Sequence, residues 1–335
     1  MYEIPLVDIR EADPVQLLKL HIELARTLIG SSRDVFGIAS RVASYAAFPL
    51  ADLIARKWLE KTDNPYRQEI LELDRILGGE GVIGLNLCYE WGCTSGVYKK
   101  NGSATLTRVL DWPFPKLGET VLVTHQRGKA GDFYNVTWPG LAGTFNAMAP
   151  GRFAAAINQA PMRRYITGLP IDWAINRRRM YKANGLPPAH LLRKVFETAS
   201  TYQEAKEMLS REPICIPVIF ALSGTNENEA CVIERLETEY AIREMEKDRV
   251  CVSNHFETWL NGIGYGWMPR PIDSPGRIQT ARAVPVSAVN ATFDWFTPPI
   301  ANEMSRIAIV ADAGQKTLAV IGTSGATPVS KTFIL

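Results

Sequence analysis

The stretch that decides the fold of this chain is residues 90–112, with the sequence EWGCTSGVYKKNGSATLTRVLDW. Two runs rich in strand-forming residues flank the Asn-Gly pair at 101–102. Asn-Gly between such runs is the strongest short-range signal for a β-hairpin. A two-residue turn at this position pairs Cys93 with about Leu110, so the second strand lies beside the cysteine.

Cys93 has the surroundings of a nucleophile on this hairpin. Arg108 comes close to the sulfur, where a positive charge favours the thiolate. Asp111 can accept a hydrogen bond from an α-amino group if the chain is cut between Gly92 and Cys93. Such an amine titrates at about 7.7–8.0, close to the best value for a catalytic base at neutral pH. We therefore interpret Gly92–Cys93 as a self-cleavage site. The alternative is a buried structural thiol beside a structural Arg–Asp ion pair.

The composition is that of a globular protein without a nucleic-acid surface. The 335 residues are 46% hydrophobic, enough for a large core in one or two domains. The net charge is +2 and no basic run exceeds Arg177–Arg179, which gives no support to a nucleic-acid partner. The first residues lack the basic and apolar regions of a secretory signal.

The cysteines and histidines do not have the spacing of a metal site. The five cysteines are odd in number and lack the CxxC spacing of zinc ligands, and the four histidines are far apart. Cys215, Cys231 and Cys251 lie in apolar, strand-like runs typical of buried free thiols. We expect no metal and no cofactor, and a reducing, cytoplasmic location.

Residues 1–92 have a helical pattern. Apolar positions recur at helical spacing over Pro14–Ile29, and further helices are expected from Ser32 to about Phe48 and over Tyr66–Leu77. The apolar stretch Val35–Trp58 contains charged residues and a proline, which favours a core helix pair over a membrane span. An interfacial helix in contact with lipid is the weaker alternative.

From residue 93 the pattern changes to strands separated by turns. Two helices interrupt them, Pro187–Ala199 and Tyr202–Arg211, and a further helical stretch is expected near Ile278–Val289. Strands are expected at Cys93–Tyr98, Ser103–Trp112, Glu119–Gln126, Phe133–Trp138, Gly143–Ala147, Arg152–Asn158, Ile216–Leu222, Ala230–Leu236, Glu239–Glu244, Val250–Ser253, Ser305–Ala311 and Thr317–Ile321. This order fits an α+β protein in which two antiparallel sheets stack face to face with helices outside, an αββα sandwich.

The chain from Cys93 to about residue 320 resembles the cysteine N-terminal-nucleophile (Ntn) hydrolases of the choloylglycine hydrolase type. This group includes bile salt hydrolases, penicillin V acylases, acid ceramidase and the N-acylethanolamine-hydrolysing acid amidase. The resemblance implies the same sandwich with a helical N-terminal pro-segment. Residues 1–92 would be the α fragment, which stays attached after self-cleavage, and residues 93–335 the catalytic β fragment.

Six residues match the family's catalytic positions. The family's nucleophile, arginine and aspartate map onto Cys93, Arg108 and Asp111. Three further matches come from the motifs FAAAINQ at 153–159, VSNHF at 252–256 and DSPGR at 273–277. The residues that these motifs supply are Asn158, Asn254 and Arg277.

The resemblance also implies roles for these three residues. Asn158 would contact the oxyanion or orient the substrate, although a turn residue at a strand exit is its structural alternative. Asn254 would be the side-chain donor of the oxyanion hole, and Arg277 the late active-site arginine. Arg270 and Arg282 compete with Arg277 for that last role.

The chain departs from the family pattern at three points. The interval from Cys93 to Arg108 is one residue shorter than usual. Gln159 stands where acid-ceramidase-like members tend to have glutamate, and Ser253 replaces the usual threonine. The neighbouring His255 suggests a Cys–His dyad as an alternative, but the order of residues does not match papain-like enzymes.

The activity implied is hydrolysis of a linear amide bond in a small N-acyl substrate through a Cys93 thioester, with the Cys93 α-amine as base. The alternatives are an acyltransferase that uses the same thioester and a non-processed ligand-binding relative. Dimers and tetramers occur in the family, so a homo-oligomer is compatible with the sequence. Apolar residues near the catalytic strand ends are expected to line an acyl pocket, with a core role as the alternative: Trp112, Phe114, Trp138 and Met148.

Overall fold

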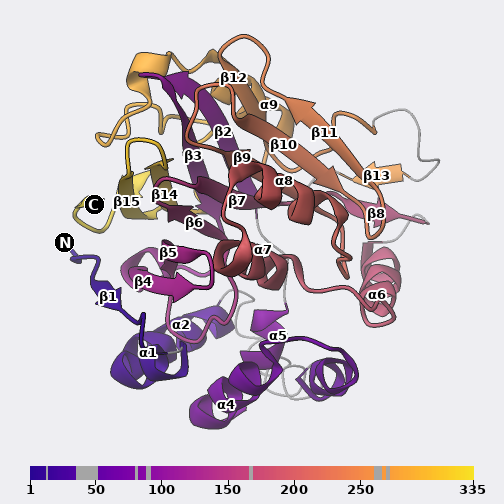
Figure 1. Ribbon diagram of the computed structural model, residues 1–335. Helices are drawn as coiled ribbons and strands as arrows, with labels where there is room; N and C mark the ends of the chain where they lie inside the picture. Colours follow the sequence, from indigo (N-terminus) through magenta and orange to yellow (C-terminus); the bar gives the residue numbers. More distant parts are fainter. Residues whose placement is uncertain are drawn as a thin grey trace.

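The computed structural model describes residues 1–12, 14–34, 52–79, 82–87, 92–165, 169–259, 266–268 and 272–335. Within these residues two large sheets dominate the molecule, with helices on their outer faces and at one end (Figure 1).

The larger sheet has eight strands and is antiparallel except at one edge, where β1 and β4 run parallel. Its strands in spatial order are β1 (Leu6–Asp8), β4 (Leu122–Gly128), β5 (Gly131–Thr137), β6 (Asn146–Ala149), β7 (Phe153–Gln159), β9 (Val218–Ser223), β10 (Ala230–Arg235) and β11 (Tyr240–Glu244).

The second sheet is antiparallel and contains the predicted hairpin of Cys93 at its centre. Its strands in spatial order are β12 (Arg249–Val252), β2 (Gly92–Lys100), β3 (Ser103–Asp111), β14 (Ser305–Asp312), β15 (Thr317–Ser324) and β16 (Thr327–Pro328), with β17 (Phe333–Ile334) paired to β15. A separate small sheet joins β8 (Met162–Arg164) to β13 (Gly266–Met268).

The two sheets stack face to face. β2 and β3 contact β7 and β9, while α7 (Pro188–Thr198) and α8 (Tyr202–Arg211) cover the outer face of the larger sheet. α9 (Ser274–Ala283) covers β2 and β12 on the opposite side. The predicted αββα sandwich is therefore confirmed. Every residue of β3 is buried, because one face of this strand meets the larger sheet and the other lies beneath covering segments.

The helices of the N-terminal segment lie together at one end of the sandwich (Figure 1). They are α1 (Pro14–Leu20), α2 (Ile22–Asp34), a helical run over residues 52–61, α4 (Arg67–Leu77) and α5 (Val82–Asn86). α4 matches the prediction and ends at Gly78, whose φ of 79° is the left-handed conformation that favours glycine. None of the helices in the described part of the chain is both long and apolar enough to cross a membrane.

The predicted helix over Pro14–Ile29 is wrong in one respect, because it is broken at His21. The backbone N–H of His21 is shared between Leu17 O and Leu18 O at 3.1 Å each, as is common where a helix ends. The second helix does not begin after Ser32, which lies inside α2. The rest of that prediction, residues 35–51, falls outside the described residues.

The N-terminal segment is also not wholly helical. Leu6–Asp8 forms β1, which adds to the edge of the larger sheet beside Val123 and its neighbours. Three residues are too few to show a strand period, so the pattern gave no sign of this pairing. The sequence likewise did not predict α6 (Leu169–Met180), the small β8–β13 sheet, or the short helical turn at Leu117–Glu119. The helical stretch expected near Ile278–Val289 is α9, which begins earlier, at Ser274, and ends at Ala283, followed by a short helical turn at Val286–Ala288.

Candidate active site

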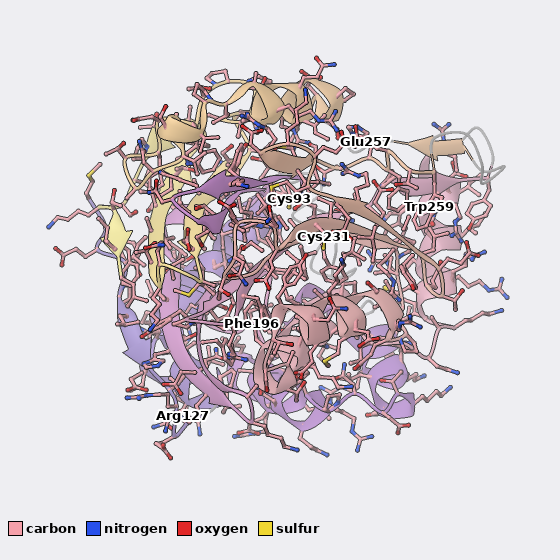
Figure 2. The ribbon with its side chains drawn as sticks, turned by 45° about the horizontal axis from the view of Figure 1, so that its top comes forward. Cys93, Arg127, Phe196, Cys231, Glu257 and Trp259 are labelled. Carbon is pink, nitrogen blue, oxygen red and sulfur yellow. The ribbon has the colours of Figure 1, made fainter. Side chains whose placement is uncertain are left out.

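The hairpin that contains Cys93 forms in the predicted register. Asn101 and Gly102 have positive φ angles of 51° and 76°, as a type I′ turn requires. Cys93 pairs with Leu110 and Gly92 with Asp111. Cys93 lies in the interior, among the strands of the two sheets (Figure 2).

The Cys93 sulfur faces a buried guanidinium. Arg108 Nη2 lies 3.0 Å from Cys93 Sγ and also donates to Ile157 O at 2.8 Å. Burial raises the pKa of Cys93 to about 11, and the positive charges of Arg108 and Arg277 only partly oppose this effect. In the uncut chain the thiol is therefore protonated at neutral pH.

Asp111 is held from two sides. Its Oδ1 accepts a hydrogen bond from Ser305 Oγ at 2.7 Å, and its Oδ2 lies 3.4 Å from Arg277 Nη1. Burial raises the pKa of Asp111, while Arg277 and Ser305 act in the opposite direction. A Cβ on Gly92 would lie 3.1 Å from Asp111 Cβ. The small residue before the nucleophile therefore leaves room for this carboxylate.

Asn254 holds the backbone nitrogen of Cys93. Asn254 Oδ1 accepts from Cys93 N at 2.9 Å and from Arg277 Nη2 at 2.8 Å. Its Nδ2 donates to Gln159 O at 2.9 Å. We expected Asp111 to accept a hydrogen bond from this nitrogen once it is a free amine, whereas in the intact chain the acceptor is Asn254. Because Nδ2 is bonded to the protein here, its role as an oxyanion donor stays a prediction.

Arg277 is the arginine that reaches the site. It is buried, and its Nη1 donates to Cys93 O and, at 2.9 Å, to Thr94 Oγ1. Of the two competing residues, Arg282 forms an exposed ion pair elsewhere, and Arg270 lies outside the described residues. Arg277 thus bridges the nucleophile, Asp111 and Asn254 from the outer helix α9.

Asn158 ties the two sheets together next to the site. Its Oδ1 accepts from Ser95 Oγ at 2.6 Å, and its Nδ2 donates to Ser253 O at 3.1 Å. Both ends of the amide are used within the protein, so a contact between Asn158 and substrate stays a prediction.

His255 contacts Ser274 rather than the nucleophile. The Nδ1 atom of His255 lies 2.7 Å from Ser274 Oγ, which also accepts from Asn254 N at 2.9 Å. Sequence reasoning missed Ser274 and likewise Ser305, the partner of Asp111. Ser274 stands in the DSPGR motif at 273–277, but that motif was used only for Arg277, and Ser305 stands in no pattern that signals a site.

A narrow apolar pocket begins one residue after Asp111. Three of the four predicted pocket residues line it, namely Trp112, Phe114 and Trp138, whereas Met148 is buried in the core and does not. Its walls enclose about 440 Å³ with the open mouth included, yet only about 30 Å³ has room for water molecules. The opposite wall comes from the N-terminal segment and contains Ala25, Leu28, Ile29, Leu77, Val82 and Asn86.

The model of one protein family, acyl-coenzyme A:6-aminopenicillanic acid acyl-transferase, matches residues 99–279, more than half of the chain. The chain belongs to this acyl-transferase family. The matched residues include five of the six predicted catalytic positions and begin shortly after Cys93.

Individual relatives agree with the Ntn-hydrolase group to which the sequence pointed. Acid ceramidase of Mus musculus is 25% identical over 254 residues, covering 74% of this chain and 60% of the relative. Acid ceramidase of Heterocephalus glaber is 25% identical over 277 residues, covering 75% of this chain and 66% of the relative. The chain thus spans less than two thirds of the length of these relatives.

A solved structure supports the fold of this acyl-transferase family member. The Caenorhabditis elegans orthologue of N-acylethanolamine-hydrolysing acid amidase superposes with a TM-score of 0.53 at 18% identity, covering 72% of this chain and all of that chain. The resemblance and the fold class predicted from the sequence are therefore confirmed.

Proposed function

We propose that this protein is a self-cleaving cysteine amidase. In the maturation step, Cys93 Sγ attacks the carbonyl carbon of Gly92 and the Gly92–Cys93 C–N bond breaks. The nitrogen receives the thiol proton and becomes an α-amine. Water then hydrolyses the resulting thioester, which leaves a Gly92 carboxylate and a free thiol.

In the catalytic step, the same thiol attacks the carbonyl carbon of an N-acyl amide. The α-amine of Cys93 accepts the thiol proton and passes it to the leaving nitrogen, and water releases the acid from the thioester. Arg108 favours the thiolate, and Arg277 and Asn254 supply polar groups around the reacting residue. Asp111 stabilises the protonated amine by its negative charge.

One pair of contacts at Cys93 carries this proposal. Arg108 Nη2 lies 3.0 Å from the sulfur, and Asn254 Oδ1 accepts from the nitrogen at 2.9 Å. After cleavage the same oxygen would hold the new amine beside the sulfur. Few structural roles require both a guanidinium on a buried thiol and a side-chain acceptor on its own backbone nitrogen.

An apolar acyl group is the best fit for the substrate. The apolar pocket is lined by Trp112, Phe114 and Trp138, and its other wall is aliphatic apart from Asn86. The names of the relatives, acid ceramidase and N-acylethanolamine-hydrolysing acid amidase, fit the same class of N-acyl amide.

Intact mass of the purified protein tests the proposal. We expect two masses, for residues 1–92 and 93–335, and amidase activity that disappears in Cys93→Ala, which stays one chain. Cys215→Ala is the matched control, because Cys215 is equally buried but lies far along the chain from the hairpin. A single uncut chain with full amidase activity would contradict the mechanism.

Acyl transfer is the second candidate, favoured by the family's own description as an acyl-transferase. In that case an amine or thiol, rather than water, takes the acyl group from Cys93. Product analysis with an added amine acceptor separates the two reactions, since transfer yields a new amide in place of the free acid. A chain that neither cleaves nor forms an adduct with an acyl-directed electrophile would instead be a ligand-binding relative.

A further inference from the structure

The loop that joins β5 to β6 forms part of the apolar pocket. Residues 139–141 line it, and with Ala142 they are called here the wall loop. The loop is not part of either sheet, so something other than strand pairing must fix its position. The groups that do so come partly from the N-terminal segment.

Asn86, at the end of α5, binds the backbone of the wall loop twice. Its Nδ2 donates to Gly140 O at 2.9 Å and to Val82 O at 3.0 Å, and its Oδ1 accepts from Ala142 N at 2.7 Å. The side chain is 3% exposed. These contacts determine the orientation of the Asn86 side-chain amide, because only its oxygen can accept from Ala142 N and only its nitrogen can donate to Gly140 O.

A second anchor approaches from the catalytic side. Arg193 Nη1 donates to Ala142 O at 2.7 Å and to the Glu69 carboxylate of the N-terminal segment at 2.7 Å. The wall loop is therefore held between two fragments that self-cleavage would separate. Asn86 belongs to the N-terminal segment and bonds to the loop directly.

The pocket is narrow enough for the position of one wall to matter. Of the space between its walls, only about 30 Å³ has room for water. An acyl chain can enter only where the walls part, and a small shift of the wall loop changes how deep it can reach. Loss of the Asn86 contacts also removes the partner of the buried Ala142 N–H and of the partly buried Gly140 carbonyl, which favours a shifted loop.

We propose that Asn86 is a positioning residue that sets the width of the acyl pocket and thereby the acyl length the enzyme prefers. The N-terminal fragment would thus contribute to specificity after cleavage without touching the reacting atoms. This inference rests on the proposed amidase function for its substrate class. It makes no claim about the chemical step at Cys93.

The test measures the binding of straight-chain carboxylic acids of increasing length, and then the kcat/KM of the matching N-acyl amides. Binding is followed by the fluorescence of Trp112 and Trp138 in the mature protein. In Asn86→Ala we expect the ratio of long-chain to short-chain affinity to change about tenfold, the effect of losing a buried hydrogen bond. The rate of Cys93 labelling by a small electrophile should stay unchanged.

Asn86→Asp is the second variant. It keeps the acceptor for Ala142 N but replaces the donor to Gly140 O with an oxygen, so the loop should move without loss of side-chain volume. Asn64→Ala is the matched control. Asn64 is also a buried asparagine of the N-terminal segment and lies 2.8 Å from His190 Nδ1, but it does not line the pocket. Its loss should lower stability and leave the length profile as in wild type.

The outcomes separate this inference from the proposed function. A length profile that is the same in wild type and in both folded Asn86 variants would overturn the inference, even in an active amidase. A shifted binding profile in a protein that hydrolyses no N-acyl amide would support the positioning role of Asn86 and refute the amidase. A shift of equal size in Asn64→Ala would show a general loosening and also overturn the inference.

Discussion

At the residue scale, burial and charge act on Cys93 in opposite directions. Removal from water favours the neutral thiol, and the guanidinium of Arg108, 3.0 Å from the sulfur, favours the thiolate. Burial dominates in the uncut chain, where the pKa of Cys93 is about 11. A free α-amine at residue 93 would change this balance, because it adds a proton acceptor next to the sulfur.

Replacing Arg108 should therefore raise the thiol pKa further. For Arg108→Met we expect the pH midpoint of Cys93 alkylation to move up by about one unit or more, the usual effect of a lost opposite charge at this distance. The measurement is the alkylation rate at Cys93 across pH, followed by peptide mass analysis. Arg108→Lys keeps a positive charge and should move the midpoint less. Equal midpoints in wild type and Arg108→Met would show that the guanidinium does not act on the sulfur.

At the element scale, α7 joins the larger sheet to the N-terminal segment through polar groups. His190 is fully buried, and its Nδ1 lies 2.8 Å from Asn64 Nδ2. Arg193, one turn further on, contacts Glu69 of α4. Buried polar groups need hydrogen-bond partners. The partners of His190 and Arg193 named here belong to the N-terminal segment, whose covalent link to the rest of the chain self-cleavage would cut.

His190 makes the stability of the fold depend on pH. Burial, and then the positive charge of Arg193, lowers the pKa of His190 from 6.5 to about 3. Between pH 6.5 and about pH 3, His190 is protonated in the unfolded chain but neutral in the folded protein. The stabilisation is thus fully present above pH 6.5 and is lost as the pH falls toward 3. We expect the free energy of unfolding to fall by about 2 kcal/mol between pH 7 and 5 from this group alone, at about 1.4 kcal/mol per unit.

Denaturant unfolding at both pH values measures this effect. His190→Asn keeps a polar partner for Asn64 but cannot be protonated, so its stability should fall by about 2 kcal/mol less than that of wild type over the same interval. Equal losses in the two proteins would mean that His190 is not the titrating group.

At the scale of the whole molecule, the N-terminal segment is attached at both of its ends. Tyr2 N donates to Val329 O at 3.0 Å near the C-terminus, and β1 extends the larger sheet. Near its other end, Asn86 binds the wall loop. Contacts this widely spaced make the segment part of the sandwich rather than a detachable leader.

We therefore expect the two fragments to elute together from a sizing column after cleavage and to separate only in denaturant. Arg193→Met should weaken this association by about 1.5–3 kcal/mol, because it removes the hydrogen bonds that Arg193 donates to the partly buried Glu69 carboxylate. Arg235→Met is the matched control, since Arg235 is buried but donates only to Leu209 O and Glu212 O of its own fragment. Free N-terminal fragment from unmodified protein in native buffer would contradict this expectation.

The local parts of this protein could be predicted from its sequence. The hairpin register follows from its Asn-Gly turn, because a two-residue loop fixes which residues pair. Cys93, Arg108 and Asp111 are therefore brought together by a short stretch of chain. The sequences of helices α4, α7 and α8 show a helical period of apolar residues and residues typical of helix ends, which predicted these helices. The order of strands and helices along the chain predicted the αββα sandwich. Asn254 and Arg277 were predicted as site residues because their motifs resemble those of the family.

The distant groups that complete the site could not be predicted, because they meet only in the packed fold. Ser305 bonds to Asp111, Ser274 to Asn254, and Asn86 to the wall loop, and no stretch of sequence shows that these residues pair. The same holds for β1, whose three residues form a strand only because an edge of the sheet is there to pair with. A local sequence pattern reflects interactions between residues that are close together in the chain. Contacts across the fold depend on where two packed sheets place side chains, which no single stretch encodes.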